Sequence, residues 1–548
     1  MPRKNVAFFI DQIYSIWNND WVSTMDIVPG SEQASRCDIT IERTTSKREQ
    51  GLRGFLTAIE EREGELKRIS AEVDADLETS TINYLVGKAV GSPALFFENI
   101  KGHRGYRALY NMLGSSAARI QIALGEEPGG SVSDVVTLLK NRMRNKLQPS
   151  IIDALCAPVN QNVVDGSEVD ITRFPAPRMW PLDGGRYLGT ATAVITQDPD
   201  TGRTNVGTYR QMVQSKNAVT VYTSPGKDGG LDRQKWWAMG KPAPVAIAYG
   251  IDPALLMVSG QSFPKTESEY DFYGGLTGRP IELFKSDLTG LMVPANVEIL
   301  AEGFFKPGDD AVEGPFGEFT AYYGRSEGPC PSVTFEKLRF RNDPILTCSL
   351  MADWPSNDAG LSYAIARSAR IWSDLDALGI PGIKGVWTPP EAVVFGMTIV
   401  SIKQMYAGHA SQVLALASQC MAGAYFTKYV VVVDDDVDPF NVSDVLWAIV
   451  TRSRPAESID ILRETWSTYL DPSQNPPEIR PWGSKALINA CKQHRFMNAF
   501  APRSKLSKAA YERVSSRWQE LGFDTDVPEV SVFEEQAFPS SVSMIPNK

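Results

Sequence analysis

Histidine is scarce in this sequence, and its cysteines form no C-x-x-C pair. Its 548 residues include three histidines and six cysteines, with no C-x-x-C pair: His103, His409 and His494; Cys37, Cys156, Cys330, Cys348, Cys420 and Cys491. The cysteine spacing indicates neither a disulfide framework nor a thiolate zinc site. So few histidines also disfavour a His-rich metal site or a Ser-His-Asp triad. Acid–base chemistry in this protein therefore falls to carboxylates.

Positive charge and long apolar runs are also in short supply. The net charge is −10, from 65 acidic and 55 basic residues, which argues against a nucleic-acid partner. The longest apolar runs fall short of the ~20 residues that span a bilayer, so no membrane span is expected. The first residues, MPRKNVAFFIDQIYSIW, reach charged and polar positions too early for a signal peptide. We expect a cytoplasmic protein.

Nucleotide and calcium motifs fail on inspection. The glycine-rich stretches GGLTGRP and GKDGGLD have neither G-x-x-x-x-G-K-[ST] nor G-x-G-x-x-G spacing. DDDVDPFN, which begins at Asp434, resembles a calcium loop, but Pro439 stands where glycine is required and Val445 where the bidentate glutamate is required. The stretch is better explained as a strand end that leads into a helix cap.

What the sequence does contain is an ordinary folded composition in three regions. Hydrophobic residues make up 43% and charged residues 22%, and a chain of this length usually forms two or three domains. We expect an N-terminal α/β domain over 1–165, a central β-rich domain over 166–345 and a C-terminal α/β domain over 346–548.

Local patterns support this division. Residues 50–70 have helical apolar spacing, and 187–213 predicts a hairpin with a turn at 198–202. The central region is expected to form an antiparallel barrel or sandwich. After residue 346, strands and helices alternate, with extended 391–403, helical 408–423 and a buried strand at 429–434. One more amphipathic helix is expected over 505–523.

A polar set in the central region gives the functional candidates: Asn205, Arg210, Lys227, Asp228, Glu269, Glu313 and Glu318. Asn205 and Arg210 would face opposite sides of an unbroken strand, but a bulge or tight turn near Gly207 would let both reach one site. EGPFGE, residues 313–318, cannot form a regular strand or helix, so its turn could aim both carboxylates into a pocket. The alternative is that these glutamates are solvated turn residues and Arg210 an ordinary ion-pair partner.

Six segments together resemble the UbiD family of reversible decarboxylases: DITRFPAPRMWPLDGGRYLGT, TGRTNVGTYRQMV, ESEYDFYGGLTGRPIEL, LMVPANVEILAEG, EGPFGEFTAYYG and VVVVDDDVDPFNVSDVLWAIVTRSRP. The resemblance covers nearly the whole chain. It implies an α+β and α/β multidomain fold, with an N-terminal α/β domain and a central split β-barrel like that of flavin reductases. The C-terminal α/β domain would end in a helix that reaches a partner subunit.

The resemblance also implies a cofactor and residue roles. The family uses prenylated FMN, which a separate flavin prenyltransferase makes and whose phosphate is held through a divalent metal. Glu318 matches the family's proton donor, and Arg210 and Glu313 complete a Glu-Arg-Glu network. A carboxyl in an apolar pocket has a raised pKa and one beside a guanidinium a lowered pKa, so two glutamates that share one arginine can differ in protonation.

The phosphate site is implied in a modified form. Asn205 and Glu269 match the family's metal ligands, and Mn2+ or Mg2+ suits such oxygen ligands, with K+ as a further ion. Many relatives have a histidine where this sequence has Lys227 or Asp228. Asp228 could ligate the metal, or Lys227 could pair with the phosphate directly. The remaining cofactor contacts are expected from Thr208, Tyr209, Arg210, Ser224 and Gly229.

Substrate and assembly are the least specified expectations. We favour an aromatic or heteroaromatic, hydroxylated carboxylic acid, which would release CO2, over an α,β-unsaturated acid of the cinnamic type. A homodimer or a dimer-based higher oligomer is expected. Two other classes stay open, a plain-FMN oxidoreductase and a non-catalytic flavin-binding scaffold. Bleaching by NAD(P)H would mark the oxidoreductase.

Overall fold

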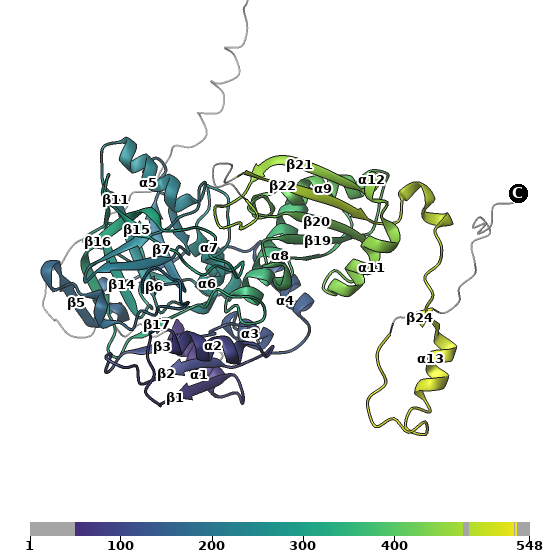
Figure 1. Ribbon diagram of the computed structural model, residues 1–548, viewed down its shortest axis with the longest axis horizontal. Coiled ribbons are helices and arrows are strands. Elements are labelled where there is room, and N and C mark those ends of the chain that lie inside the picture. Colours follow the sequence, from purple (N-terminus) through teal and green to yellow (C-terminus); the bar gives the residue numbers. More distant parts are fainter. Residues whose placement is uncertain (1–49, 475–481, 531, 534–548) are drawn as a thin grey trace, which may run out of the picture. The chain divides into compact units, whose positions relative to one another are not determined.

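The computed structural model describes residues 50–474, 482–530 and 532–533 (Figure 1). The N-terminal MPRKNVAFFIDQIYSIW segment and Cys37 lie outside the described residues. The described chain forms a mixed α/β structure with several separate sheets, as the sequence predicts. No helix in these described ranges is long and apolar enough to cross a bilayer.

The N-terminal sheet has four strands in the order β1-β2-β3-β17. The strands are β1 (Leu66–Ile69), β2 (Ala94–Phe97), β3 (Arg107–Tyr110) and β17 (Ile345–Thr347). The first four helices are α1 (Leu52–Glu60), α2 (Glu78–Gly87), α3 (Ala117–Ala123) and α4 (Val132–Arg142). The helix expected over 50–70 is confirmed only over Leu52–Glu60. α1 ends at Glu60, Gly64 turns the chain with φ 82°, and β1 then pairs in parallel with β2.

The central sheet has ten strands, and its main path runs β6-β9-β10-β16-β14-β11-β7-β8, with β5 and β15 paired to β16. Every pairing in it is antiparallel, as predicted. The strands β5 to β11 and β14 to β16 span Asn162–Asp165, Tyr187–Gly189, Thr192–Gln197, Thr204–Gly207, Gln211–Ser215, Ala218–Val221, Ala243–Tyr249, Ile299–Phe305, Asp310–Glu313 and Gly328–Phe340. Closure into a split barrel stays a prediction.

The predicted hairpin is present, and its second strand breaks where the site requires it. β7 and β8 pair across a turn in which Gly202 N–H donates to the Asp198 carbonyl at 2.9 Å. β8 ends at Gly207, where an added Cβ would lie 2.4 Å from the Tyr209 ring. The chain resumes as β9, which pairs with β6 and β10 instead of β7. Residues 208–210 therefore lie outside both strands, although the Arg210 carbonyl still accepts from the Tyr222 N–H at 3.1 Å, and they line the cavity described below.

The C-terminal sheet has the order β18-β19-β20-β22-β21. Its central strands β19, β20 and β22 are parallel and its edge strands antiparallel, which confirms the expected α/β alternation. Strands β18 to β22 span Ile383–Trp387, Met397–Ile402, Tyr429–Asp434, Ile459–Trp466 and Trp482–Ala490, and helices α8 to α12 span Gly360–Ala377, His409–Gln419, Met421–Ala424, Val442–Arg452 and Pro455–Ser458.

Two C-terminal expectations need correction. The extended stretch begins at Met397 and not at residue 391, because Pro390–Ala392 forms a 3-10 turn and Val393 and Val394 have positive φ. The tail helix α13 covers only Lys508–Ser515, and none of its residues is buried. With no core to pack against, the apolar pattern beyond residue 515 is not extended into helix. That this helix reaches a partner subunit stays a prediction.

The remaining elements include a three-stranded and a two-stranded sheet. They are the helices α5, α6 and α7 at Asp228–Ala238, Pro253–Ser259 and Glu269–Thr277; the strands β4, β12, β13, β23 and β24 at Ser150–Ile151, Glu282–Lys285, Met292–Pro294, Leu506–Ser507 and Val532–Phe533; and short 3-10 turns at Ala154–Cys156, Pro158–Gln161, Gly166–Glu168, Ile171–Arg173 and His494–Ala499. α5 and α7 begin at Asp228 and Glu269, so two predicted site residues stand at helix starts.

Candidate active site

A cavity of about 310 Å3 gathers residues from the central sheet, from α5 and α7, and from the C-terminal region. All the predicted site residues line it except Glu313 and Gly229. Its volume lies within the ~300–1,000 Å3 range of small-molecule and cofactor sites. Residues separated by more than 100 positions in sequence therefore share one concave site. We call this cavity the main cavity.

Arg210 joins the two glutamates of EGPFGE. Its Nε and Nη2 donate to the two oxygens of Glu313 at 2.8 and 3.0 Å, and its Nη1 donates to Glu318 Oε1. Glu313 also accepts hydrogen bonds from Arg325 Nη1 at 3.1 Å and from the Tyr187 hydroxyl at 3.0 Å. Glu313 is thus fully engaged behind the cavity wall, whereas Glu318 lines the cavity itself.

The electrostatics assign Glu313 as the anion of this network. Burial alone would raise its pKa, but the Arg210 guanidinium, together with Arg325 and the Tyr187 hydroxyl, holds the pKa of Glu313 below its ordinary value. Burial would likewise lower the pKa of Arg210, and the Glu313 carboxylate raises it instead. A bidentate, buried ion pair therefore fixes Arg210 in place, and its third nitrogen orients Glu318.

Aromatic rings frame the same residues. The Arg210 guanidinium lies 4.2 Å from the Tyr222 ring centroid and 5.0 Å from that of Phe316, in cation–π geometry. Phe319, next to Glu318, contacts Phe395 edge-on at 5.3 Å. The carboxyl of Glu318 therefore borders flat apolar walls that suit a planar ligand.

A second turn, RMWPLDGGR at 178–186, holds the EGPFGE loop from behind. A Cβ on Gly317 would lie 2.2 Å from Trp180 Cδ1, and one on Gly184 would lie 2.0 Å from the Gly314 carbonyl oxygen. Only glycine fits at either contact, so the two turns interlock. The loop's glycines thus serve close packing against this turn, beyond any role in leaving space for a ligand.

Asp183 in that turn is a site residue that sequence reasoning missed. Its Oδ1 accepts from the Gly317 N–H at 2.9 Å, and its Oδ2 accepts from the N–H groups of Trp180 and Met179 at 2.9 and 3.2 Å. Burial raises the pKa of this carboxyl despite those three bonds. Asp183 therefore anchors the residue adjacent to Glu318. The signal was available, because Asp183 lies in the first of the six segments that carry the resemblance.

The other end of the main cavity carries the predicted metal ligands. Glu269 Oε1 accepts from Arg203 Nη2 at 3.1 Å and its Oε2 from the Val206 N–H at 3.0 Å. Asp228 accepts from Arg203 Nη1 at 2.9 Å and also from Lys265. Burial raises the pKa of Glu269 to about 7, against the opposing effect of Arg203. The two carboxylates are therefore bridged by one guanidinium.

These contacts limit the fit to a divalent metal. The oxygen donors of Asn205, Asp228 and Glu269 are of the type that Mg2+ and Mn2+ prefer. However, Arg203 occupies the position between the two carboxylates. Within the described ranges, no group of three His, Cys, Asp or Glu side chains is arranged to hold a metal ion. As arranged, the residues do not form a metal cage, and the metal stays a prediction.

Lys227 offers a different way to hold an anion. Its Nζ contacts Ser262 Oγ at 3.2 Å and lies 4.1 Å from the Tyr425 ring centroid, and no described acidic side chain forms an ion pair with it. Loss of hydration, with help from Arg367 and Lys265, lowers the pKa of Lys227 to about 7. A cation that is poorly hydrated and lacks a carboxylate partner favours an anionic ligand such as a phosphate.

The remaining predicted contacts lie at the main cavity or directly behind a residue that lines it. Thr208 Oγ1 donates to the Thr192 carbonyl at 3.1 Å, and the Tyr209 hydroxyl accepts from the Gly229 N–H at 3.1 Å. Ser224 lies 3.3 Å from the Tyr425 hydroxyl, and the Asn205 amide donates to Thr196 Oγ1 at 3.0 Å. Gly229 is thus brought to the site through Tyr209. Arg203, Lys265 and Arg325 were not singled out from the sequence, since surface basic residues and site basic residues look alike there.

Comparison with protein families matches three consecutive parts of the chain. Residues 58–139 match the N-terminal domain, 151–353 the Rift-related domain and 362–490 the C-terminal domain of 3-octaprenyl-4-hydroxybenzoate carboxy-lyase, UbiD. The three matches follow the order of the three regions seen in the sequence. Together they extend over most of the chain.

Solved structures give the same result. The chain is similar to vanillic acid decarboxylase of Sedimentibacter hydroxybenzoicus in its closed form, with 29% identity over 87% of this chain and 99% of that one and a TM-score of 0.79. It is also similar to HmfF, a UbiD-class enzyme of Pelotomaculum thermopropionicum solved with FMN, with 26% identity over 83% of this chain and 97% of that one and a TM-score of 0.71. An evolved dimeric form of HmfF, solved with prFMN, matches at 26% identity over 84% of this chain and 99% of that one, with a TM-score of 0.71.

Proposed function

The chain belongs to the UbiD family of carboxy-lyases, and on that premise we propose that it decarboxylates an aromatic or heteroaromatic carboxylic acid with prenylated FMN, reversibly and without net oxidation. The observation that carries this proposal is the network Glu313–Arg210–Glu318 at an aromatic-framed cavity wall. Glu318 would donate the proton that replaces CO2.

The roles of the side chains follow from their contacts. When bound, prenylated FMN supplies an electron sink that no side chain offers, because loss of CO2 leaves an electron pair on an sp2 carbon. Arg210, fixed by Glu313, would present positive charge to the substrate carboxylate. As the bond to the carboxylate carbon breaks, the Glu318 proton would form the new C–H bond. Glu318 is then left as a carboxylate beside Arg210.

The main cavity fits a phosphorylated flavin. Its lining includes aromatic rings that can face a flat ring system, and Lys227 and Lys265 that can face a phosphate. The phosphate would be held by these cations, with Thr208, Tyr209, Ser224 and Gly229 near the rest of the cofactor. A Mn2+ or Mg2+ ion on Asn205, Asp228 and Glu269, with or without K+, is proposed only as an addition to them. The evolved HmfF solved with prFMN supports the choice of cofactor.

The walls and the relatives favour an aromatic substrate. Phe319, Phe395 and Tyr425 line the main cavity and can stack on a flat ring. A relative at 29% identity is a vanillic acid decarboxylase. We propose a hydroxylated aromatic acid on these grounds, and a cinnamic-type acid as the substrate to screen next. The domain bounds 1–165, 166–345 and 346–548, the dimer-based assembly, the flavin prenyltransferase supplier and the cytoplasmic location are part of the same proposal.

The first test is Glu318→Gln in protein co-expressed with a flavin prenyltransferase. We expect decarboxylation of hydroxybenzoic acids to fall at least ~1,000-fold, because the amide cannot donate the proton, a contribution of the size that general acids make. Absorbance and mass spectrometry of the released ligand should show unchanged prenylated FMN. The matched control is Glu336→Gln, whose glutamate is 40% exposed and pairs with Lys306 at 3.4 Å; it should leave turnover unchanged.

Three results would contradict this function. Wild-type rates in Glu318→Gln would remove Glu318 from the proton-donor role. Plain FMN that bleaches with NAD(P)H, without CO2 release, would indicate an oxidoreductase. A folded protein that binds flavin and converts neither acids nor NAD(P)H would be a scaffold. Elemental analysis of the same preparations decides whether a divalent metal accompanies the cofactor.

A further inference from the structure

Glu318 borders a second cavity as well as the main one. This cavity has a volume of about 210 Å3 and shares Glu318 and Met351 with the main cavity. Its other walls include Trp180, Tyr323 and Tyr84. We call it the rear cavity. Glu318 therefore lines both cavities, and no feature of the sequence indicates the second one.

The rear cavity reaches the protein surface over a very short segment. Glu318 N–H donates to the Tyr322 carbonyl at 3.0 Å, so residues 318–322 form one tight turn, with Ala321 at φ 61°. Glu318, at the inner end of that turn, is 5% exposed, while Tyr322, at its outer end, is 63% exposed. Asp353, whose side chain is 49% exposed and pairs with Lys88 at 2.7 Å, lines the same cavity. The turn thus links the buried carboxyl to solvent.

The polar groups of this cavity suit water. Its lining includes two residues with carboxylates, Glu318 and Asp353, and two with phenolic hydroxyls, Tyr322 and Tyr323. One water molecule needs a cavity volume on the order of 10–15 Å3 and two to four polar partners. Cavities lined only by apolar groups stay dry. Glu318 Oε1 is used by Arg210, and within the described chain no hydrogen bond is formed by its Oε2. An oxygen with free lone pairs thus remains for a water.

We propose that the rear cavity holds water through which Glu318 recovers its proton from solvent after each turnover. The inference rests on the proposed function, because it takes Glu318 as the proton donor. Each decarboxylation consumes one proton: the C–C bond to the carboxylate breaks, a C–H bond forms with the Glu318 proton, and CO2 leaves. Glu318, now anionic, takes a proton from a rear-cavity water, and that water is reprotonated by bulk solvent.

Glu318 needs a second route for its proton because the flavin and the substrate would occupy the main cavity during turnover. During turnover the main cavity would be filled by the flavin and the substrate ring, so water could reach Glu318 from that side only after the product leaves. The rear cavity, which also borders Glu318, would give water a second path to this side chain. Reprotonation and product exchange can then proceed independently.

The test plugs the outer end of the rear cavity. Tyr322→Cys in a Cys156→Ser background, which removes an exposed thiol, is loaded with prenylated FMN and labelled with benzyl methanethiosulfonate. We expect the first turnover, one product per flavin, at the unlabelled rate, followed by steady-state turnover at least tenfold slower. Dithiothreitol, which removes the label, should restore the rate. The matched control is Val163→Cys in the same background, on the 42% exposed position of β5.

The outcomes separate this inference from the proposed function. Equal slowing of first and later turnovers, or no slowing with full labelling, would overturn the water route. No product in the first turnover of unlabelled enzyme would instead overturn the decarboxylase proposal. A crystal structure of the loaded wild type under xenon pressure gives a readout that needs no activity. Ordered water at Glu318 Oε2 is the expected result, and xenon without water in the rear cavity would refute the proposal.

Discussion

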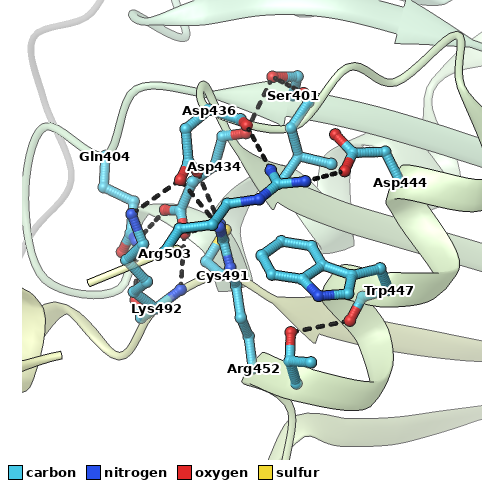
Figure 2. A network of polar contacts seen from close by, with 12 residues as sticks. Ser401, Gln404, Asp434, Asp436, Asp444, Trp447, Arg452, Cys491, Lys492 and Arg503 are labelled. Carbon is cyan, nitrogen blue, oxygen red and sulfur yellow. Dashed lines mark hydrogen bonds and ion pairs between the residues drawn. The ribbon is translucent and has the colours of Figure 1, made fainter. Parts of the chain in front are cut away.

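Two buried arginine–carboxylate networks in this molecule use the same chemistry with different outcomes. Arg210 binds Glu313 and Glu318 at the wall of the main cavity. In the C-terminal region, Arg452 on α11 binds Asp434 and Asp436 at the end of β20 (Figure 2). The second network lines neither of the two cavities described above. Ion-pair geometry alone therefore does not identify a reactive site.

The difference lies in which carboxylate oxygens are satisfied. Asp434 accepts from Gln404 Nε2 at 2.6 Å on Oδ1, and from Arg452 and the Lys492 N–H on Oδ2. Asp436 accepts from Arg452 on both oxygens, with Lys492 Nζ added at 3.0 Å. Every oxygen of this pair has a protein donor, whereas Glu318 Oε2 has none among the described residues. A saturated network stabilises the fold, and an unsaturated one facing a cavity is available for chemistry.

The largest expected effect comes from Arg210→Lys. A single ammonium cannot reproduce the bidentate bond to Glu313 and reach Glu318 as well. We expect turnover to fall at least ~1,000-fold, about 4 kcal/mol in activation free energy, with a smaller change in the free energy of unfolding. Steady-state kinetics and urea unfolding of the flavin-loaded protein measure both. A loss of stability without a loss of turnover rate would show that the Arg210 network only stabilises the fold.

Arg452→Lys is the matched change in the second network and should show the reverse. One ammonium cannot supply all three bonds that Arg452 donates, and Asp436 Oδ1 has no other protein donor among the described residues. Unfolding should therefore become easier by roughly 3 kcal/mol, the upper end for hydrogen bonds to charged groups. Turnover per folded, flavin-loaded molecule should stay within twofold of wild type. A rate loss comparable to that of Arg210→Lys would end the distinction between the two networks.

Asp436→Asn gives the pH dependence of the second network. Burial opposes ionisation of this carboxyl, but Arg452 and Lys492 lower the pKa of Asp436 to about 2, below an unfolded value near 3.8. Such a group stabilises the fold above pH ~4, and its contribution is lost as pH falls from about 4 to about 2. The variant should therefore lose about 2 kcal/mol at pH 7. Urea unfolding at pH 7 and pH 3 should show the difference shrinking; a constant difference would rule out the ionic origin.

The sequence predicts structure well where the prediction concerns a single strand or helix. The alternation that leads to β20 and α11 was read from apolar runs and a cap, and Asn441 does cap α11 through its side chain. Glu313, Arg210 and Glu318 were brought together only by resemblance, because spacing says nothing about residues more than 100 positions apart. The helix expected over 50–70 stops at Glu60, and Gly64 then adopts a positive φ that apolar periodicity does not reveal.

The phosphate end shows why the rest could not be predicted. Asp228 and Glu269 were expected to bind a metal, but whether their oxygens are free depends on Arg203 and Lys265, which arrive from a hairpin and a loop. Residue types alone do not reveal that a guanidinium lies between two carboxylates. The same holds for the rear cavity, whose walls come from α2, the 178–186 turn and the 351–353 loop.

The smallest expected effect tests whether the site's geometry depends on Asp183. Asp183→Asn leaves a carbonyl to accept from some of the N–H groups of Gly317, Trp180 and Met179 but replaces an acceptor with a donor. A shift of Gly317 would move Glu318 without removing it, so we expect kcat to fall about tenfold, well short of the ~100-fold that a 1 Å misplacement can cost. Flavin content and KM should not change, because Asp183 touches neither cavity. Loss of flavin along with kcat would mean that Asp183 supports the whole central sheet, and an unchanged kcat would show that the interlocking glycines alone position Glu318.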